Sequence, residues 1–540
     1  MESNENLIDL NLAQEAVSLL RQIVENGISS LKGLVESSEK SSVNAIDDYQ
    51  VLAYDLAHSV AGYKLAEHAL FGANNGQNDG SLALAFIADV FGDVISRSVG
   101  REDFWGINSG LSPTVLTFLK RYRDPAFLAS LYEIDVKTND SEEFELVRET
   151  FKRFASDKIR PRAEHVHRNN EDVPEDIIEG LAEIGAFGLS VPEEYGGFAL
   201  GGEHDYIGMV IATEELSRGS LGIGGSLITR PEILARALIA GGTEEQKNEY
   251  LPKLATAEIM NAVAVTEPDY GSDVANISVT ATEGDGGWYI NGVKTWCTFA
   301  ARADVLMLLA RTDPDKSVTH RGLSLFVVPK ERAESHGFVI EKESPNGKSK
   351  LEGRPIDTIG YRGMHSYELA FENWWVPDEN LVGGKDGLNK GFYFQMKGFE
   401  NGRLQTAARA VGVMQAALDA AIEYAQNRKV FGSPIGNYQL TQAKIGKMKA
   451  IVNASRQFSY EVAKLMGQGK GSMEASLVKA YVCKAAEWVT REAMQIHGGM
   501  GYAEEYDVSR YFVDARVLSI FEGADETLCL KVIARSLIQD

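Results

Sequence analysis

The stretch that decides the fold is Thr266–Asp273, with the sequence TEPDYGSD, followed by Asn291–Thr298, with the sequence NGVKTWCT. The first segment has the composition of a strand end and a turn, because Pro, Asp and Gly interrupt regular structure. Between the two segments, apolar residues flank Gly284–Gly287, a pattern that predicts a β-hairpin. Both segments therefore belong to a predicted β region.

The strand pattern continues beyond this hairpin and is bounded by helical patterns. Further short strands are predicted at Val305–Ala310, Leu323–Val328 and Glu368–Phe371. Apolar residues recur at helical spacing on either side. The segregated order predicts a mostly α, α+β chain rather than a βαβ repeat. We predict a helical extension at 1–135, a helical domain at 136–258, a central β domain at 259–378 and a C-terminal helical bundle at 379–540. No chemical motif appears in the extension, which we interpret as a docking or oligomerisation layer.

Composition limits the classes of function. The chain has 540 residues and a formal charge of −23, which opposes binding to nucleic acid or anionic membranes. No apolar run approaches the length of a membrane span. The acidic start lacks the features of a signal or transit peptide. Its three cysteines lie far apart, which predicts neither a disulfide framework nor a metal site. We expect a cytoplasmic protein.

Several common enzyme motifs are missing. No Gly-x-Gly-x-x-Gly follows a strand and opens a helix, so a nicotinamide enzyme lacks its main support. A Walker loop and a serine nucleophile elbow are also absent from the sequence.

Four separated motifs instead resemble the acyl-CoA dehydrogenase family of flavoproteins. They are the two segments quoted above, Arg428–Gly432 with Gln439 beyond it, and Gln495–Tyr502. The run Ile520–Gly523 follows them near the C-terminus. The match runs from about residue 140 to the C-terminus. It implies a helical domain, a central β-barrel-like domain and a C-terminal four-helix bundle, in the order predicted from periodicity.

The resemblance implies FAD as the cofactor and assigns contacts to it. Thr266, Gly271 and Ser272 would line the flavin, Trp296 would lie against the isoalloxazine ring, and Thr298 would hydrogen-bond its N5 edge. A hydroxyl donor near N5 would stabilise charge that arrives with a hydride.

The other two motifs imply further contacts with FAD. Those of Arg428, Phe431 and Gln439 would be with the FAD of a neighbouring subunit, which implies a homodimer or homotetramer, and the glycines at 498 and 499 would let the backbone approach a phosphate or ribose. The implied residues are Arg428, Phe431, Gln439, Gln495, Gly498 and Gly499. The planar guanidinium of Arg428 suits pyrophosphate oxygens.

Glu522 matches the position of the family's usual catalytic base, which removes a proton alpha to the thioester carbonyl. An apolar site beside Phe521 would raise its pKa toward the working pH. Gly523, Ser272 and Arg403 are the implied substrate contacts. Two positions depart from the family: Ala524 stands where Thr is usual, and Gly402, before Arg403, replaces the carboxylate that some members use as the base.

The acyl group is predicted from three further features. The extension, the insert Ser344–Lys350 and the segment Ile359–His365 resemble the branch of the family that oxidises (2S)-methylsuccinyl-CoA to mesaconyl-CoA in the ethylmalonyl-CoA pathway. Such a substrate carries a free carboxylate, which needs a cationic partner if it is buried. Arg230 is our candidate, and a surface ion pair with a nearby Glu is the competing interpretation.

Three hypotheses about function follow. The first is a dehydrogenase that passes electrons to electron-transferring flavoprotein, acting on methylsuccinyl-CoA or on another short or branched acyl-CoA. The second is an acyl-CoA oxidase on the same scaffold. The third is a non-catalytic module that retained the fold, against which Glu522 and the four flavin motifs argue.

Overall fold

The computed structural model describes residues 2–38, 42–76, 79–107, 110–136, 138, 141–333 and 336–539. The chain forms two compact units, one built from Met1–Leu146 with Thr406–Asp540 and the other from Val147–Gln405. Among the described residues, no helix is both long and apolar enough to span a bilayer. The mostly α, α+β class predicted from the sequence is confirmed.

The unit from Val147 to Gln405 contains a curled, mixed, eight-stranded sheet. Its strand order is β1-β4-β2-β3-β8-β7-β6, and β5 pairs with β4. The strands are β1 (Asn261–Ala264), β2 (Thr280–Gly284), β3 (Gly287–Thr298), β4 (Val305–Arg311), β5 (Leu323–Pro329), β6 (Phe338–Ser344), β7 (Gly347–Ile356) and β8 (Ser366–Pro377).

The predicted hairpin and all three further strands are present. Asp285 and Gly286 connect β2 and β3 with positive φ angles of 57° and 72°, which is the backbone of a two-residue hairpin turn. The insert Ser344–Lys350 forms the turn between β6 and β7. The longest pairing joins β3 to β8. Its register shifts between Lys294 and Cys297, within the NGVKTWCT motif of Asn291–Thr298.

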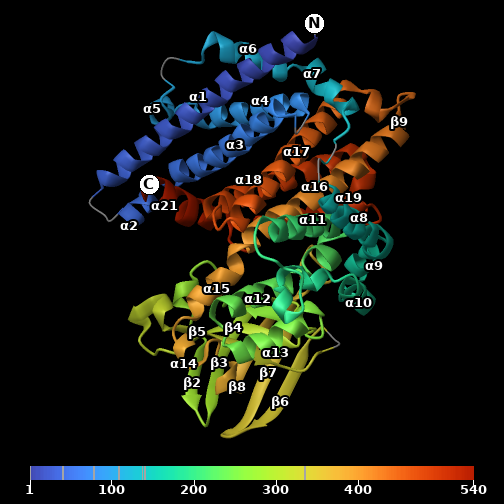
Figure 1. Ribbon diagram of the computed structural model, residues 1–540. Coiled ribbons are helices and arrows are strands. Elements are labelled where there is room, and N and C mark those ends of the chain that lie inside the picture. The colour runs from blue at the N-terminus through green and yellow to red at the C-terminus, as the bar shows by residue number, and fades with distance from the viewer. Residues whose placement is uncertain are drawn as a thin grey trace. The chain divides into compact units, whose positions relative to one another are not determined.

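Helices accompany this sheet within the same unit. They are α8 from Val147 on (Glu142–Phe154), α9 (Arg160–Asn169), α10 (Glu175–Glu183), α11 (Glu203–Gly219), α12 (Thr229–Gly241), α13 (Glu244–Ala255), α14 (Gly384–Gly387) and α15 (Gly391–Glu400). Leu234 and Leu238 of α12 pack with Leu251 of α13 against Met307 and Leu325 of the sheet in one buried core. This core gives β4 and β5 a covered face, beside α12 and α13 (Figure 1).

The other unit is helical. Its N-terminal part contains α1 (Glu2–Glu36), α2 (Ser42–Ala45), α3 (Gln50–Asn74), α4 (Gly80–Ser98), α5 (Glu102–Trp105), α6 (Pro113–Tyr122) and α7 (Pro125–Ser130). Its C-terminal part contains α16 from Thr406 on (Gly402–Asn427), the short β9 (Lys429–Val430) and β10 (Ser433–Pro434), α17 (Gln439–Gly467), α18 (Ser472–His497), α19 (Asp507–Leu518), α20 (Asp525–Thr527), a π-helical turn (Leu528–Ala534) and α21 (Arg535–Gln539).

The N-terminal extension docks on the C-terminal helices of its own chain. Helix α3 lies between α1 and α4 on one side and α17, α18 and the π-helical turn on the other (Figure 1). Its residues are buried around most of the helix, as expected of a helix surrounded by others. At Gly62 an added Cβ would lie 3.1 Å from Val90 and 3.7 Å from Tyr481, so the glycine permits close packing of α3. The layer is thus part of the unit's core.

Candidate active site

A buried ion pair organises the turn after β1. Lys294 is fully buried, and its Nζ donates to Glu267 Oε1 at 2.9 Å and to the Val265 carbonyl at 2.8 Å. Glu267 also accepts hydrogen bonds from the backbone N–H and hydroxyl of Ser278 and from the N–H of Val279. Burial would raise the pKa of Glu267, but Lys294 and Ser278 together hold it below its usual value. The sequence analysis did not identify this pair.

This turn is joined to the end of β3. The Thr295 N–H donates to the Thr266 carbonyl at 2.9 Å. At the register shift, Trp296 has a φ of 57°, and its side chain is 55% exposed while Cys297 is buried. The Thr298 hydroxyl lies 3.1 Å from that of Ser366. Thr266, Trp296 and Thr298 are therefore grouped at one end of β3.

Gly271 and Ser272 occupy the exposed part of the same turn. An added Cβ at Gly271 would meet nothing within 4 Å, so the backbone there is open to a ligand.

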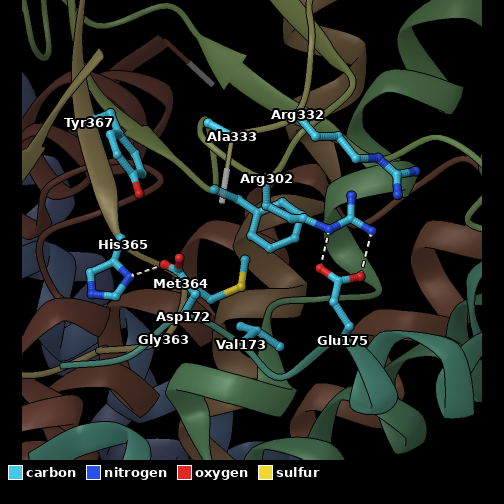
Figure 2. Close-up of a pocket in the computed structure, with 11 residues that line it drawn as sticks. Asp172, Val173, Glu175, Arg302, Arg332, Ala333, Gly363, Met364, His365 and Tyr367 are labelled. Atoms are coloured by element: carbon cyan, nitrogen blue, oxygen red, sulfur yellow. Dashed lines mark hydrogen bonds and ion pairs between the residues drawn. The ribbon is translucent and has the colours of Figure 1, made fainter. Parts of the chain in front are cut away.

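A cavity of about 410 Å³ borders the chain just after the end of β3 (Figure 2). Phe299, directly after Thr298, lines it, and its N–H donates to the carbonyls of Met364 and His365. Figure 2 shows two pairs among the lining residues, Arg302 with Glu175 and His365 with Asp172. Arg332 also lines the cavity, and it pairs with Asp304, which lies outside the lining. None of the site residues predicted from the sequence lines it.

Glu522 lies in the helical unit, in the loop after α19. It has a φ of 52° and the following Gly523 a φ of 103°, so two successive residues adopt the left-handed region. For a glutamate this conformation is costly and persists only when its surroundings enforce it. Such strain is common at functional sites.

Two residues of α16 hold the Glu522 carboxylate. Arg409 Nη1 donates to Oε1 at 2.9 Å, and the Thr406 hydroxyl donates to Oε2 at 3.1 Å. The Arg409 side chain is completely buried, and its guanidinium carbon lies 5.4 Å from the centre of the Phe521 ring. From α18, Lys479 Nζ donates to the Gly523 carbonyl at 2.7 Å.

The sequence analysis missed Arg409 and Lys479. It considered only apolar surroundings for Glu522, whereas an adjacent cation favours the ionised carboxylate. One feature of the sequence could have pointed to Arg409: it is a single cation within the apolar run Ala407–Ala410, which is typical of a buried and paired charge.

Most of the predicted dinucleotide contacts lie at one end of the helical unit. Tyr424, near the end of α16, stacks on His497 at the end of α18, with ring centres 4.2 Å apart. Arg428, Phe431 and Gln439 follow α16, and Phe431 is 96% exposed with a φ of 50°. The exposed residues Gln495, Gly498 and Gly499 lie at the end of α18 and just beyond it.

These residues are remote from Glu522 within the unit. The segment of α16 from Arg409 to Asn427 spans about 27 Å at the usual helical rise. The structure thus groups the predicted residues into three sets: the end of β3, the Glu522 loop and this end of the helices.

Arg230 and Arg403 belong to the unit that contains the sheet. Arg230 lies in the first turn of α12 and is only 6% exposed, so it is not at the surface. The hydroxyl of Ser226, just before this helix, is buried without a hydrogen-bond partner in the described part of the chain. Arg403 lies in the first turn of α16, where burial lowers the pKa of its guanidinium.

Comparison with known proteins identifies the family. The models of the acyl-CoA dehydrogenase N-terminal, middle and C-terminal domains match residues 141–258, 262–374 and 389–538. The chain is 35% identical to (2S)-methylsuccinyl-CoA dehydrogenase of Cereibacter sphaeroides, over 98% of each chain. The chain belongs to the acyl-CoA dehydrogenase family.

Two solved structures share the fold. A glutaryl-coenzyme A dehydrogenase in complex with glutaryl-CoA is 33% identical, with a TM-score of 0.66, over 74% of this chain and 96% of that one. A chain in the structure described as electron transferring flavoprotein of Acidaminococcus fermentans is 30% identical, with a TM-score of 0.67, over 75% of this chain and 100% of that one. Like other acyl-CoA dehydrogenases, the chain is an oxidoreductase.

The residues at the end of β3 fit the FAD on which this family depends. Trp296 presents an exposed ring beside the hydroxyl of Thr298, and Gly271 leaves its backbone accessible. An exposed Trp next to hydroxyl donors suits the flat, polar-edged ring of a flavin. The glycines at 498 and 499 are likewise open, since an added Cβ would meet nothing within 4 Å.

Proposed function

We propose that this acyl-CoA dehydrogenase oxidises (2S)-methylsuccinyl-CoA to mesaconyl-CoA, as in the ethylmalonyl-CoA pathway. The observation that carries the proposal is the similarity to (2S)-methylsuccinyl-CoA dehydrogenase over 98% of both chains, which includes the N-terminal extension. The glutaryl-CoA dehydrogenase structure, in contrast, corresponds to 74% of the chain.

Glu522 is the proposed catalytic base. Its carboxylate accepts hydrogen bonds from Arg409 and Thr406, which orient it to accept the alpha proton of the thioester. Bound FAD, held by Thr266, Gly271, Ser272, Trp296 and Thr298, supplies the acceptor for the hydride that leaves the beta carbon. Gly523, Ser272 and Arg403 are the proposed contacts to the rest of the substrate.

Arg230 is the proposed partner of the substrate's free carboxylate. Its burial favours this role, because a charge-assisted pair between a guanidinium and a carboxylate is strong in a site shielded from water. Ser226 offers a buried hydroxyl on the same segment. Both lie at the start of α12, where the helix dipole also favours an anion.

We also propose a homodimer or homotetramer in which one subunit contributes Arg428, Phe431, Gln439, Gln495, Gly498 and Gly499 to the FAD of another. The separation of about 27 Å along α16 supports this arrangement, because the base and these residues lie far apart within one chain. The proposed electron acceptor is electron-transferring flavoprotein, and the proposed location is the cytoplasm.

The decisive experiment is anaerobic reduction of the FAD-loaded protein by a panel of thioesters, followed by the loss of absorbance near ~450 nm. Methylsuccinyl-CoA should reduce the flavin faster than butyryl-CoA, isovaleryl-CoA or glutaryl-CoA. Glu522→Gln should keep bound FAD but lose the reaction by several orders of magnitude. Rapid reduction by Glu522→Gln would place the base elsewhere, and preference for another thioester would reject the proposed substrate. Oxygen consumption during aerobic turnover would indicate an oxidase.

A further inference from the structure

The loop that carries Glu522 is fastened to the N-terminal extension through Asp525, three residues further along. Tyr54 Oη of α3 donates to Asp525 Oδ2 at 2.5 Å, and His58 Nε2 lies 3.1 Å from the same oxygen. Tyr54 and His58 are four residues apart, so they lie on one face of α3. Their rings contact each other edge to face, with centres 4.7 Å apart.

Asp525 is buried and strongly held in this position. Burial would raise the pKa of its carboxyl group, but His58, Tyr54 and Lys484 outweigh that effect and lower the pKa to about 2. The carboxylate is thus ionised at neutral pH, and hydrogen bonds to an ionised group are the strong ones. Asp525 is a firm point of attachment between α3 and the residues that follow Glu522.

The attachment reaches the loop itself through the backbone. The Asp525 N–H donates to the Ser519 carbonyl at 3.0 Å, which closes the loop from 519 to 525 around Glu522. Helix α18 holds the same loop from another direction, through Lys479 on the Gly523 carbonyl and Glu487 on the Ser519 hydroxyl. The loop is therefore clamped between α18 and α3.

The conformation of Glu522 explains why a clamp is needed. A glutamate with a φ of 52° is in a sparsely populated region and relaxes unless neighbouring contacts prevent it. Helices α16 and α18, which contact the loop, belong to the same C-terminal part of the chain as the loop. The N-terminal extension contributes two further residues, Tyr54 and His58, which contact Asp525.

We propose that Tyr54 and His58 are positioning residues: through Asp525 they hold the loop in the conformation that aims Glu522 at the substrate. The extension thereby becomes part of the catalytic apparatus without touching the reacting atoms. The catalytic part of this inference rests on the proposed role of Glu522 as the base, whereas the clamp itself does not.

The test compares Tyr54→Phe with Tyr63→Phe. Tyr63 lies on the same helix, is buried where Tyr54 is half-buried, and like Tyr54 donates to a carboxylate, that of Glu67, which is not in the Glu522 loop. Both variants lose one hydroxyl from α3, so a general weakening of the helix affects them alike. Two more variants test the second donor: His58→Leu removes it, and His58→Gln retains an N–H.

Two readouts are measured on the FAD-loaded, full-length protein. In the thioester assay, Tyr54→Phe and His58→Leu should lower kcat about tenfold, the usual scale for losing a hydrogen bond to a charged group, with KM changed less than about twofold. His58→Gln should recover most of the rate. Amide hydrogen exchange of residues 517–527 should accelerate in Tyr54→Phe, because the loop opens more often. Tyr63→Phe should leave both readouts near wild type.

The outcomes separate the clamp from the proposed function. Equal exchange in the 517–527 segment for Tyr54→Phe and Tyr63→Phe would overturn the clamp, whatever the activity. Faster exchange with unchanged kcat would overturn the positioning role. If the wild-type protein reduces no thioester, the proposed function fails, and faster exchange in Tyr54→Phe alone would still support the clamp.

Discussion

Arg409 donates a hydrogen bond of 2.9 Å to Glu522, and its side chain is completely buried. Such a partner stabilises a buried cation, because an unpaired charge is costly to bury. This pairing gives the Glu522 carboxylate an orientation before any substrate binds. Apolar surroundings alone, which is what the sequence indicates around Phe521, would have favoured the protonated and inactive form.

The rate of flavin reduction as a function of pH should depend on the pair formed by Arg409 and Glu522. In Arg409→Met the carboxylate loses its cation, so it takes up a proton at higher pH and the acid limb of the pH–rate profile should move upward by about 1–3 pH units. Arg409→Lys retains a positive charge and should shift the limb less. Thr406→Val, which removes a neutral hydrogen bond, provides the matched comparison. A profile that does not move in Arg409→Met would mean that the cation does not control the protonation of Glu522.

Lys294 should be essential for stability rather than for chemistry. Lys294→Met leaves Glu267 buried without its cation, and the free energy of unfolding should fall by about 3–5 kcal/mol. Urea denaturation followed by circular dichroism measures the loss. The double variant Glu267→Gln/Lys294→Met removes both charges and should recover part of it. If the double variant is no more stable than Lys294→Met, the isolated charge is not the cause.

Arg230 should discriminate between substrates. Arg230→Ala should raise KM for methylsuccinyl-CoA by at least about tenfold, because the substrate carboxylate loses a charge-assisted partner. Butyryl-CoA, which lacks that carboxylate, is the control within the same variant, and its KM should change little. For Arg230→Lys, the KM for methylsuccinyl-CoA should lie between those of wild type and Arg230→Ala, since lysine keeps the charge but not the planar guanidinium. Equal increases for both thioesters would remove Arg230 from carboxylate recognition.

Asp525 should contribute stability that depends on pH. Its pKa is lowered from 3.8 to about 2 in the folded protein, so the folded state binds the proton less readily than the unfolded state does. The contribution is therefore complete above about pH 4 and is lost as the pH falls toward about 2. The difference in unfolding free energy between wild type and Asp525→Asn should shrink over this range. A difference that stays constant would show that the charge of Asp525 is not what stabilises the loop.

Local patterns in the sequence predict much of this structure. The hairpin at Gly284–Gly287 and the strand at Val305–Ala310 are confirmed, because turn residues and apolar alternation act over a few neighbouring positions. The grouping of Thr266 with Trp296 and Thr298 also follows from two motifs on adjacent segments. Which of these residues contact FAD remains a prediction.

Contacts between distant segments could not be predicted in the same way. Arg409 and Glu522 are 113 positions apart, and Tyr54 and Asp525 are 471 apart. No local pattern records such pairings, because they depend on how whole helices pack. The extension was for this reason interpreted only as a docking or oligomerisation layer, although its helix α3 fills the centre of its unit.

The amino-acid sequence by itself determined the family, the order of helices and strands, and the carboxylate that serves as the proposed base. Residue types and short spacings predict the order of helices and strands through backbone propensity and periodicity. The family and the base follow from the resemblance of short motifs. Only the tertiary structure decided that Glu522 is held in a left-handed conformation between Arg409, Lys479 and the Asp525 clamp. The physical reason is burial: a charge or a strained backbone persists only where packing from several segments excludes water and supplies partners.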